Sequence, residues 1–126
     1  MNHVKLNFKA DEGLLTTDSN FTVKIFKDGA KPYDMLLGAL GSCFYATFMS
    51  IVEKKKLTFD EVDLDISGRK RTEVPTTLED VNIKMVIKNP SNEQQLLKSA
   101  ELGAKYCSIY ETISKVAKMN LEVIFE

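Results

Sequence analysis

The sequence is poor in the residues that build metal sites and disulfide frameworks. Its 126 residues include one histidine, His3, and two cysteines, Cys43 and Cys107. Two thiols and one imidazole are too few for a closed tetrahedral zinc site, so we expect no metal cofactor. The first residues, MNHVKLNFK, carry charges and no apolar run, so we expect no targeting segment and a cytoplasmic location. A structural disulfide is uncommon there, so the cysteines are either small core residues or a redox centre.

The sequence also lacks an excess of either charge. It has 17 basic and 18 acidic residues, with a net charge of -1. This balance argues against a surface for nucleic acid or for an anionic membrane. The one dense basic cluster, Arg69, Lys70 and Arg71, is closely followed by acidic residues, which is typical of a solvated turn.

Long apolar runs are scarce, and only the segment from Met35 to Val52 contains no charged residue over such a length. It is near the lower limit for a membrane span, which is about 17 residues. Because Gly38, Gly41 and several hydroxyl side chains interrupt it, and no second such segment occurs, we expect a buried core helix and no membrane span. Pro32 suits the first turn of this helix, and Asp34 suits its positive N-terminal end.

Alternating apolar and polar residues predict several half-buried strands. These strands are expected near Val4–Lys9, Phe21–Ile25, Val62–Ile66, Val81–Ile87 and Leu121–Phe125. A turn at residues 11–13 lets a further strand, Leu14–Thr17, pair back on the first. Ser91 with Gln94, and Ser108 with Glu111, have the spacing of capping boxes and predict two short helices, with Gly103 interrupting the first. The order has no regular βαβ alternation, so we expect one α+β domain over residues 1–126 with an antiparallel sheet.

The helix predicted from Met35 to Val52 is apolar on all of its faces. Such a helix must be buried on all sides. One sheet from so short a chain cannot cover it, whereas a second copy of the chain can. The sequence therefore predicts a homodimer.

The local surroundings of the two cysteines predict different reactivity. Cys107 directly precedes the helix that Ser108 would cap, and the positive end of a helix lowers the pKa of a nearby thiol. Cys43 lies inside the apolar helix, where burial alone would raise its pKa and make it inert. On local sequence alone, Cys107 is the better candidate for a reactive thiol and Cys43 for a core residue.

Two longer motifs add to this interpretation. Residues 32–43 read PYDMLLGALGSC, and residues 105–113 read KYCSIYETI, with 64 residues from Cys43 to Cys107. The chain resembles the OsmC/organic hydroperoxide resistance family, in which P-x-E-L-L-L-x-A-L-x-x-C opens a central helix and C-S/P-V-x-x-T-L opens a later one. The resemblance implies an α+β fold in which an antiparallel sheet wraps around a central buried helix in an intertwined homodimer.

The resemblance also implies an activity, that of a thiol-dependent peroxidase for organic hydroperoxides. Cys43 would be the peroxidatic cysteine and Cys107 the resolving cysteine. The first becomes a sulfenic acid, the second closes a disulfide, and an external dithiol restores both without a bound cofactor. The apolar side chains of Phe44, Tyr45 and Phe48, with Met49, would line the site and favour lipophilic peroxides.

The sequence departs from the family pattern at two positions. Peroxidases of the family use an arginine from the N-terminal region, but no arginine precedes Arg69 here. The family glutamate corresponds to the shorter Asp34, which is therefore a candidate site residue. Asp34 precedes Cys43 by nine residues, and at about 100° per residue an ideal helix places them on opposite faces. A partner for the helix dipole is an equally good interpretation of Asp34.

Two alternatives to a peroxidase stay open from the sequence. One is a non-catalytic member of the family that binds an apolar ligand, with Cys43 as part of the core; the missing arginine favours it. The other is a hotdog-type domain, which also wraps a sheet around an apolar helix and would make the two cysteine motifs coincidental.

Overall fold

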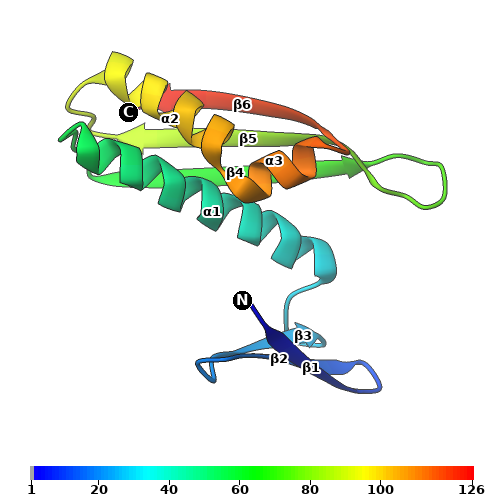
Figure 1. The fold of residues 1–126 in the computed structure, drawn as a ribbon. Coiled ribbons are helices and arrows are strands. Elements are labelled where there is room, and N and C mark those ends of the chain that lie inside the picture. The colour runs from blue at the N-terminus through cyan, green and yellow to red at the C-terminus, as the bar shows by residue number, and fades with distance from the viewer. Residues whose placement is uncertain (1) are drawn as a thin grey trace. The chain divides into compact units, whose positions relative to one another are not determined.

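The computed structural model describes residues 2–126 and divides the chain into two compact units, one ending at Gly38 and the other running from Ala39 to Glu126. We describe each unit by itself (Figure 1). The elements, in chain order, are β1 (Val4–Lys9), β2 (Glu12–Thr17), β3 (Thr22–Phe26), α1 (Pro32–Lys54), β4 (Glu61–Lys70), β5 (Leu78–Lys88), α2 (Glu93–Tyr106), α3 (Ser108–Ser114) and β6 (Lys118–Phe125).

The first unit contains a three-stranded antiparallel sheet in the order β1-β2-β3. The sequence predicted these strands to within a few residues, β1 and β3 from the alternation of apolar residues and β2 from the turn before it. On β1 the apolar side chains of Val4, Leu6 and Phe8 point to the same side, because side chains on a strand alternate between its two faces. They remain 47%, 49% and 50% exposed. This face, which we call the β1 apolar face, therefore has only partial cover within the chain.

The second unit contains a three-stranded sheet in the order β4-β5-β6. The β4 and β5 strands pair antiparallel, as expected, but β5 and β6 pair parallel. The expectation of a wholly antiparallel sheet is wrong at this pair. The physical reason is the connection: α2 and α3 together cross over between the two strands, and a parallel pair needs a crossover of this length.

The core of the second unit lies between the sheet and the helices that cover one of its faces (Figure 1). Buried residues on α1 recur every fourth position, which places them on one face of the helix. The central strand β5 contributes side chains at alternate positions. The main members are Leu40, Phe44, Phe48 and Val52 of α1, Val81, Ile83, Met85 and Ile87 of β5, and Leu96 and Ala100 of α2.

Helices α1 and α2 approach each other closely at Gly103. A Cβ atom built there would lie 3.4 Å from the Phe44 ring and from the Phe48 Cα atom. The sequence predicted that Gly103 interrupts its helix, and this is wrong, because α2 continues from Glu93 to Tyr106. The glycine instead gives α1 room to pack against α2.

The predicted capping box of Ser91 and Gln94 is also absent. The N-cap of α2 is Asn92, whose side chain accepts a hydrogen bond from the Gln95 backbone N–H at 3.0 Å. Ser91 instead accepts from the Thr58 backbone N–H at 2.9 Å. Asn92 is as good a cap as serine, and the sequence offers both side by side.

Helix α1 is long and apolar enough to cross a membrane by length and composition. The core helix of a globular protein passes the same test. In the second unit this helix buries the face that contains Leu40, Phe44 and Phe48, whereas Ser42, Tyr45 and Ala46 on its other side are exposed. The sequence predicted that the helix is buried on all sides. In a single chain only the face with Leu40, Phe44 and Phe48 is buried.

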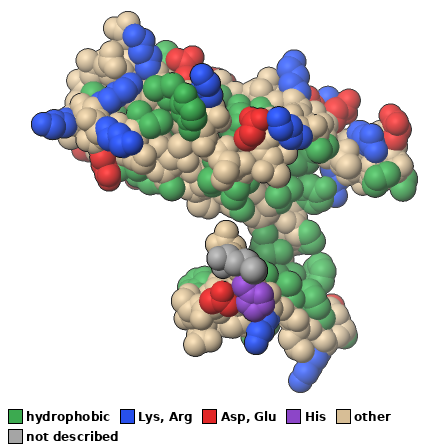
Figure 2. Space-filling model, in the orientation of Figure 1, with side chains coloured by type: hydrophobic (Ala, Val, Ile, Leu, Met, Phe, Trp, Pro, Cys, Tyr) green, Lys and Arg blue, Asp and Glu red, His purple; other side chains and the backbone are tan. Residues whose placement is uncertain are grey.

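Charged side chains of both signs are interspersed over the visible face of the second unit (Figure 2). Arg69, from the basic cluster, pairs with Glu79 at 3.7 Å and with Asp80. Arg69 is thus neutralised locally, as expected for a solvated turn.

Candidate functional site

Helix α1 places Cys43 at the edge of the core of the second unit. Its neighbour Phe44 faces inward and is 0% exposed. One position along a helix turns the side chain by about 100°. Cys43 is therefore only partly buried, and its sulfur is a free thiol.

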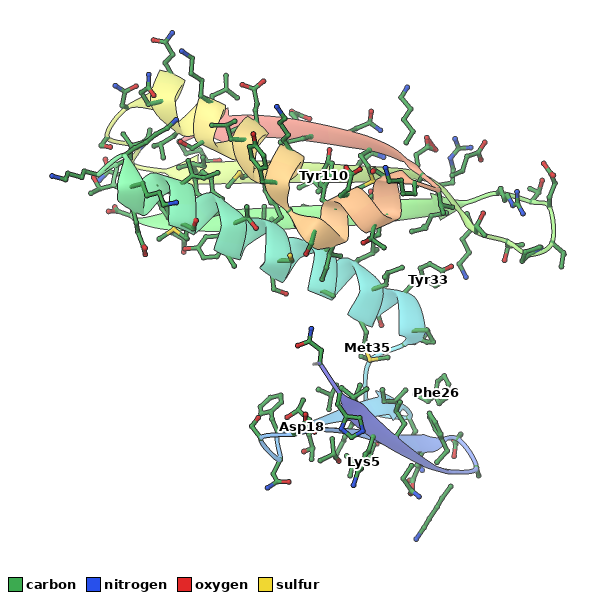
Figure 3. The ribbon with its side chains drawn as sticks, viewed as in Figure 1. Lys5, Asp18, Phe26, Tyr33, Met35 and Tyr110 are labelled. Carbon is green, nitrogen blue, oxygen red and sulfur yellow. The ribbon has the colours of Figure 1, made fainter. Side chains whose placement is uncertain are left out.

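Cys107 lies at the junction between α2 and α3, and it serves both helices. Its backbone is extended, with φ -72 and ψ 118, and its N–H donates to the Gly103 carbonyl at 2.9 Å as the C-cap of α2. Its Sγ accepts a hydrogen bond from the Tyr110 backbone N–H at 3.4 Å as the N-cap of α3. Tyr110 is labelled on α3 in Figure 3. The Cys107 side chain is 0% exposed and free.

The structure brings Cys43 and Cys107 together. Their two side chains are in hydrogen-bonding contact, and the next residue, Ser108, places its Oγ 3.9 Å from the Cys43 Sγ. The fold thus places two cysteines that are 64 residues apart in the sequence next to each other. Two free thiols in contact have the chemistry needed to form a disulfide on oxidation.

The surroundings shift the two thiols in opposite directions. The pKa of Cys43 is lowered, first by a hydrogen bond from the Ile109 backbone and then by one from the Cys107 side chain. The pKa of Cys107 is raised, mainly because burial disfavours its charged form. Of the two thiols, Cys43 therefore ionises at the lower pH.

This order reverses the prediction from local sequence. We expected a helix capped by Ser108 to activate Cys107, but Cys107 is itself the cap, and the Ser108 and Glu111 box is not formed. Glu111 instead pairs with Lys115 at 2.8 Å. The backbone N–H groups at the start of α3 lower the pKa of Cys43, a residue of another helix, while burial dominates at Cys107.

The expected apolar lining is also partly wrong. Phe44 and Phe48 are 0% exposed and belong to the core, so they cannot line an accessible site. Tyr45 is 36% exposed, and its ring lies 6.3 Å from that of Phe48. Helical spacing alone could not tell the core face of α1 from its open face, because both are apolar.

Asp34 lies in the first unit, where its carboxylate accepts a hydrogen bond from the Lys31 backbone N–H at 2.9 Å. This is a contact of the helix N-terminus, where a negative charge is favourable. It agrees with the interpretation of Asp34 as a partner of the helix end. Its catalytic role stays a prediction.

The sequence missed two features of the site. The first is the Ile109 backbone N–H, which carries no side-chain signal. The second is Ser108, which the sequence identified only as a cap; its position next to the second cysteine was the available clue. Within residues 2–126, no group of histidine, cysteine and acidic side chains is arranged to hold a metal ion.

Comparisons with known proteins bear on the family and the fold. The sequence profile of the OsmC-like protein family matches residues 25–122. A solved structure of an OsmC-like protein from Mycoplasma pneumoniae is 20% identical, with a TM-score of 0.89 over 99% of this chain and 96% of its own. A hypothetical protein from Aquifex aeolicus is 25% identical, with a TM-score of 0.84 over 100% and 98% of the two chains.

More distant structures share the fold. The organic hydroperoxide resistance protein OhrB of Bacillus subtilis is 13% identical, with a TM-score of 0.70 over 98% of this chain and 97% of its own. No curated protein sequence matches. The hotdog-type alternative is wrong, because the family match covers both cysteine motifs. The α+β fold, the paired thiols and this match lead to one conclusion: the chain belongs to the OsmC-like family.

Proposed function

We propose that the protein is a thiol-dependent peroxidase for organic hydroperoxides, with Cys43 as the peroxidatic and Cys107 as the resolving cysteine. The observation that carries this proposal is the meeting of two free thiols, one partly exposed at Cys43 and one buried at Cys107, and the lowered pKa of Cys43 and raised pKa of Cys107 agree with it. A peroxidatic cysteine must be a thiolate, and a resolving cysteine must wait beside it as a thiol. Family membership and relatives named as organic hydroperoxide resistance proteins support the same function.

The reaction has three balanced steps. The Cys43 thiolate attacks one oxygen of the hydroperoxide, the O–O bond breaks, and the alkoxide leaves and takes a proton from water to become an alcohol. Cys43 is now a sulfenic acid. The Cys107 thiol, losing its proton, attacks the Cys43 sulfur, forms the S–S bond and releases water. An external dithiol then reduces the disulfide by thiol–disulfide exchange, so no bound cofactor is required.

The test is to treat the reduced protein with one equivalent of cumene hydroperoxide, count its free thiols and locate the disulfide by peptide mass analysis. The wild type should lose both thiols and form an intramolecular Cys43–Cys107 disulfide, and hydrogen peroxide should act more slowly. Cys43→Ser should abolish dithiol-dependent turnover. Cys107→Ser should leave a sulfenic acid on Cys43 that over-oxidises on repeated exposure.

A different outcome would select the second candidate function. If no disulfide forms, and Cys43 resists alkylation until the protein unfolds, the chain is a non-catalytic member of the family that binds an apolar ligand. The absence of arginine before Arg69 is the observation that favours this candidate. It also makes us expect slow turnover, because a lysine cannot replace the planar, bidentate guanidinium group.

The proposed assembly is a homodimer in the cytoplasm, with a dithiol reductant and no nucleic acid or membrane as partner. The β1 apolar face and the open side of α1 each leave apolar side chains for a second copy to cover. Light scattering at micromolar concentration should give twice the mass of one chain. Leu6→Lys places a charge in the β1 apolar face and should favour the monomer, whereas Lys5→Glu on the opposite face of the strand should not.

A further inference from the structure

Ser108 lies beside the sulfur of Cys43. It is the first residue of α3, its side chain is exposed, and its Oγ is 3.9 Å from the Cys43 Sγ. Its backbone carbonyl accepts a hydrogen bond from the Thr112 hydroxyl at 2.9 Å, which ties the start of α3 to the rest of the helix. The backbone of Ser108 is thus fixed, and its hydroxyl lies next to the Cys43 sulfur on the side that faces solvent.

Ionisation of Cys43 decides the direction of this contact. A thiol can donate or accept a hydrogen bond, but a thiolate can only accept. The serine hydroxyl rotates freely and can do either. When Cys43 loses its proton, Ser108 must therefore be the donor, and a bond to an ionised acceptor is shorter and stronger than one between neutral groups.

The other hydrogen-bond donors to Cys43 are either backbone groups or a side chain that itself titrates. The backbone N–H groups of Ile109 and Ser108 are fixed by the fold, and Cys107 is titratable and can donate only while it is protonated. Cys107 must give up its proton when it attacks the oxidised Cys43. Tyr110, also on α3, interacts with Cys107. Ser108 is the side-chain donor that stays neutral throughout both steps.

We propose that Ser108 is a positioning residue, whose hydroxyl donates a hydrogen bond to the Cys43 thiolate and holds that sulfur ionised beside Cys107. The inference rests on the proposed function and assigns part of the thiolate stabilisation to a neutral side chain. It fits a chain with no arginine before Arg69, since the groups that lower the Cys43 pKa are neutral hydrogen-bond donors.

The test compares Ser108→Ala with Ser108→Thr, which restores the hydroxyl. The matched control is Ser114→Ala, which removes a hydroxyl from the same helix that bonds to the Glu111 carbonyl at 2.6 Å. The measurement is the iodoacetamide alkylation rate of the Cys43 peptide, followed by mass analysis from about pH 5 to about pH 10. Far-ultraviolet circular dichroism checks that each variant is folded.

We expect Ser108→Ala to shift the alkylation profile to higher pH and to slow Cys43 alkylation at neutral pH by about threefold to tenfold. Ser108→Thr should restore most of the rate, and Ser114→Ala should match the wild type. Superimposed profiles for Ser108→Ala and the wild type would overturn the inference. So would equal shifts in Ser108→Ala and Ser114→Ala, which would indicate a general effect on α3. Alkylation needs no peroxide, so this result is separate from the disulfide assay that tests the proposed function.

Discussion

The two cysteines should differ sharply in their reaction with a thiol reagent, in the order opposite to the one that the local sequence predicted. Cys43 is partly exposed with a lowered pKa, whereas Cys107 is 0% exposed with a raised pKa. Both differences act in the same direction, because alkylation requires a thiolate that the reagent can reach. We therefore predict that Cys43 is alkylated first at every pH below the ordinary cysteine range.

The size of the difference follows from the burial of Cys107. The reagent reaches Cys107 only in molecules that have opened at the junction of α2 and α3. Global unfolding at a cost of about 5 kcal/mol would slow the reaction about 5,000-fold. Local opening at about 2 kcal/mol would slow it about 30-fold. Accessibility alone should give a ratio of the two rates between these limits, and the lowered pKa of Cys43 increases the ratio further.

The assay is a time course of iodoacetamide alkylation, read separately for the peptides that contain Cys43 and Cys107. The rise of the Cys43 rate with pH should be centred below that of a free cysteine, since its lowered pKa makes it a thiolate at lower pH. In concentrated urea the two peptides should react at similar rates, which is the internal control. If Cys107 reacts first, or if the two react equally in the folded protein, the assignment of Cys43 as the thiolate is wrong.

Two stability predictions follow from the same contacts. Phe44→Ala should lower the free energy of unfolding by about 3–5 kcal/mol, because it empties a fully buried site. Urea titration at fixed protein concentration measures this loss. The loss should be much smaller for Tyr45→Ala, because Tyr45 is 36% exposed. Asn92→Ala should cost about 1 kcal/mol, because Asn92 caps α2, whereas Ser108→Ala should change stability by less than about 0.5 kcal/mol. Equal losses for Asn92→Ala and Ser108→Ala would contradict the caps that the structure assigns.

The elements of the fold were largely predictable from the sequence. Alternation of apolar and polar residues located β1 and β3 to β6, the turn before Leu14 located β2, and Pro32 marked the start of α1. These patterns are local, because a strand or helix face repeats every two or every 3.6 residues. The parallel pairing of β5 with β6 was not predictable in this way, because it depends on the path of α2 and α3 between them.

The family and the pair of cysteines could also be found in the sequence, through two motifs 64 residues apart. Their relative reactivity could not. Local sequence placed Cys107 at an activating helix end and Cys43 in an inert core. In the structure Cys107 is itself the cap and is fully buried, while the Ile109 N–H and the Ser108 hydroxyl lie next to Cys43. A pKa depends on burial and on neighbours from other segments, and only the tertiary structure decides which neighbours those are.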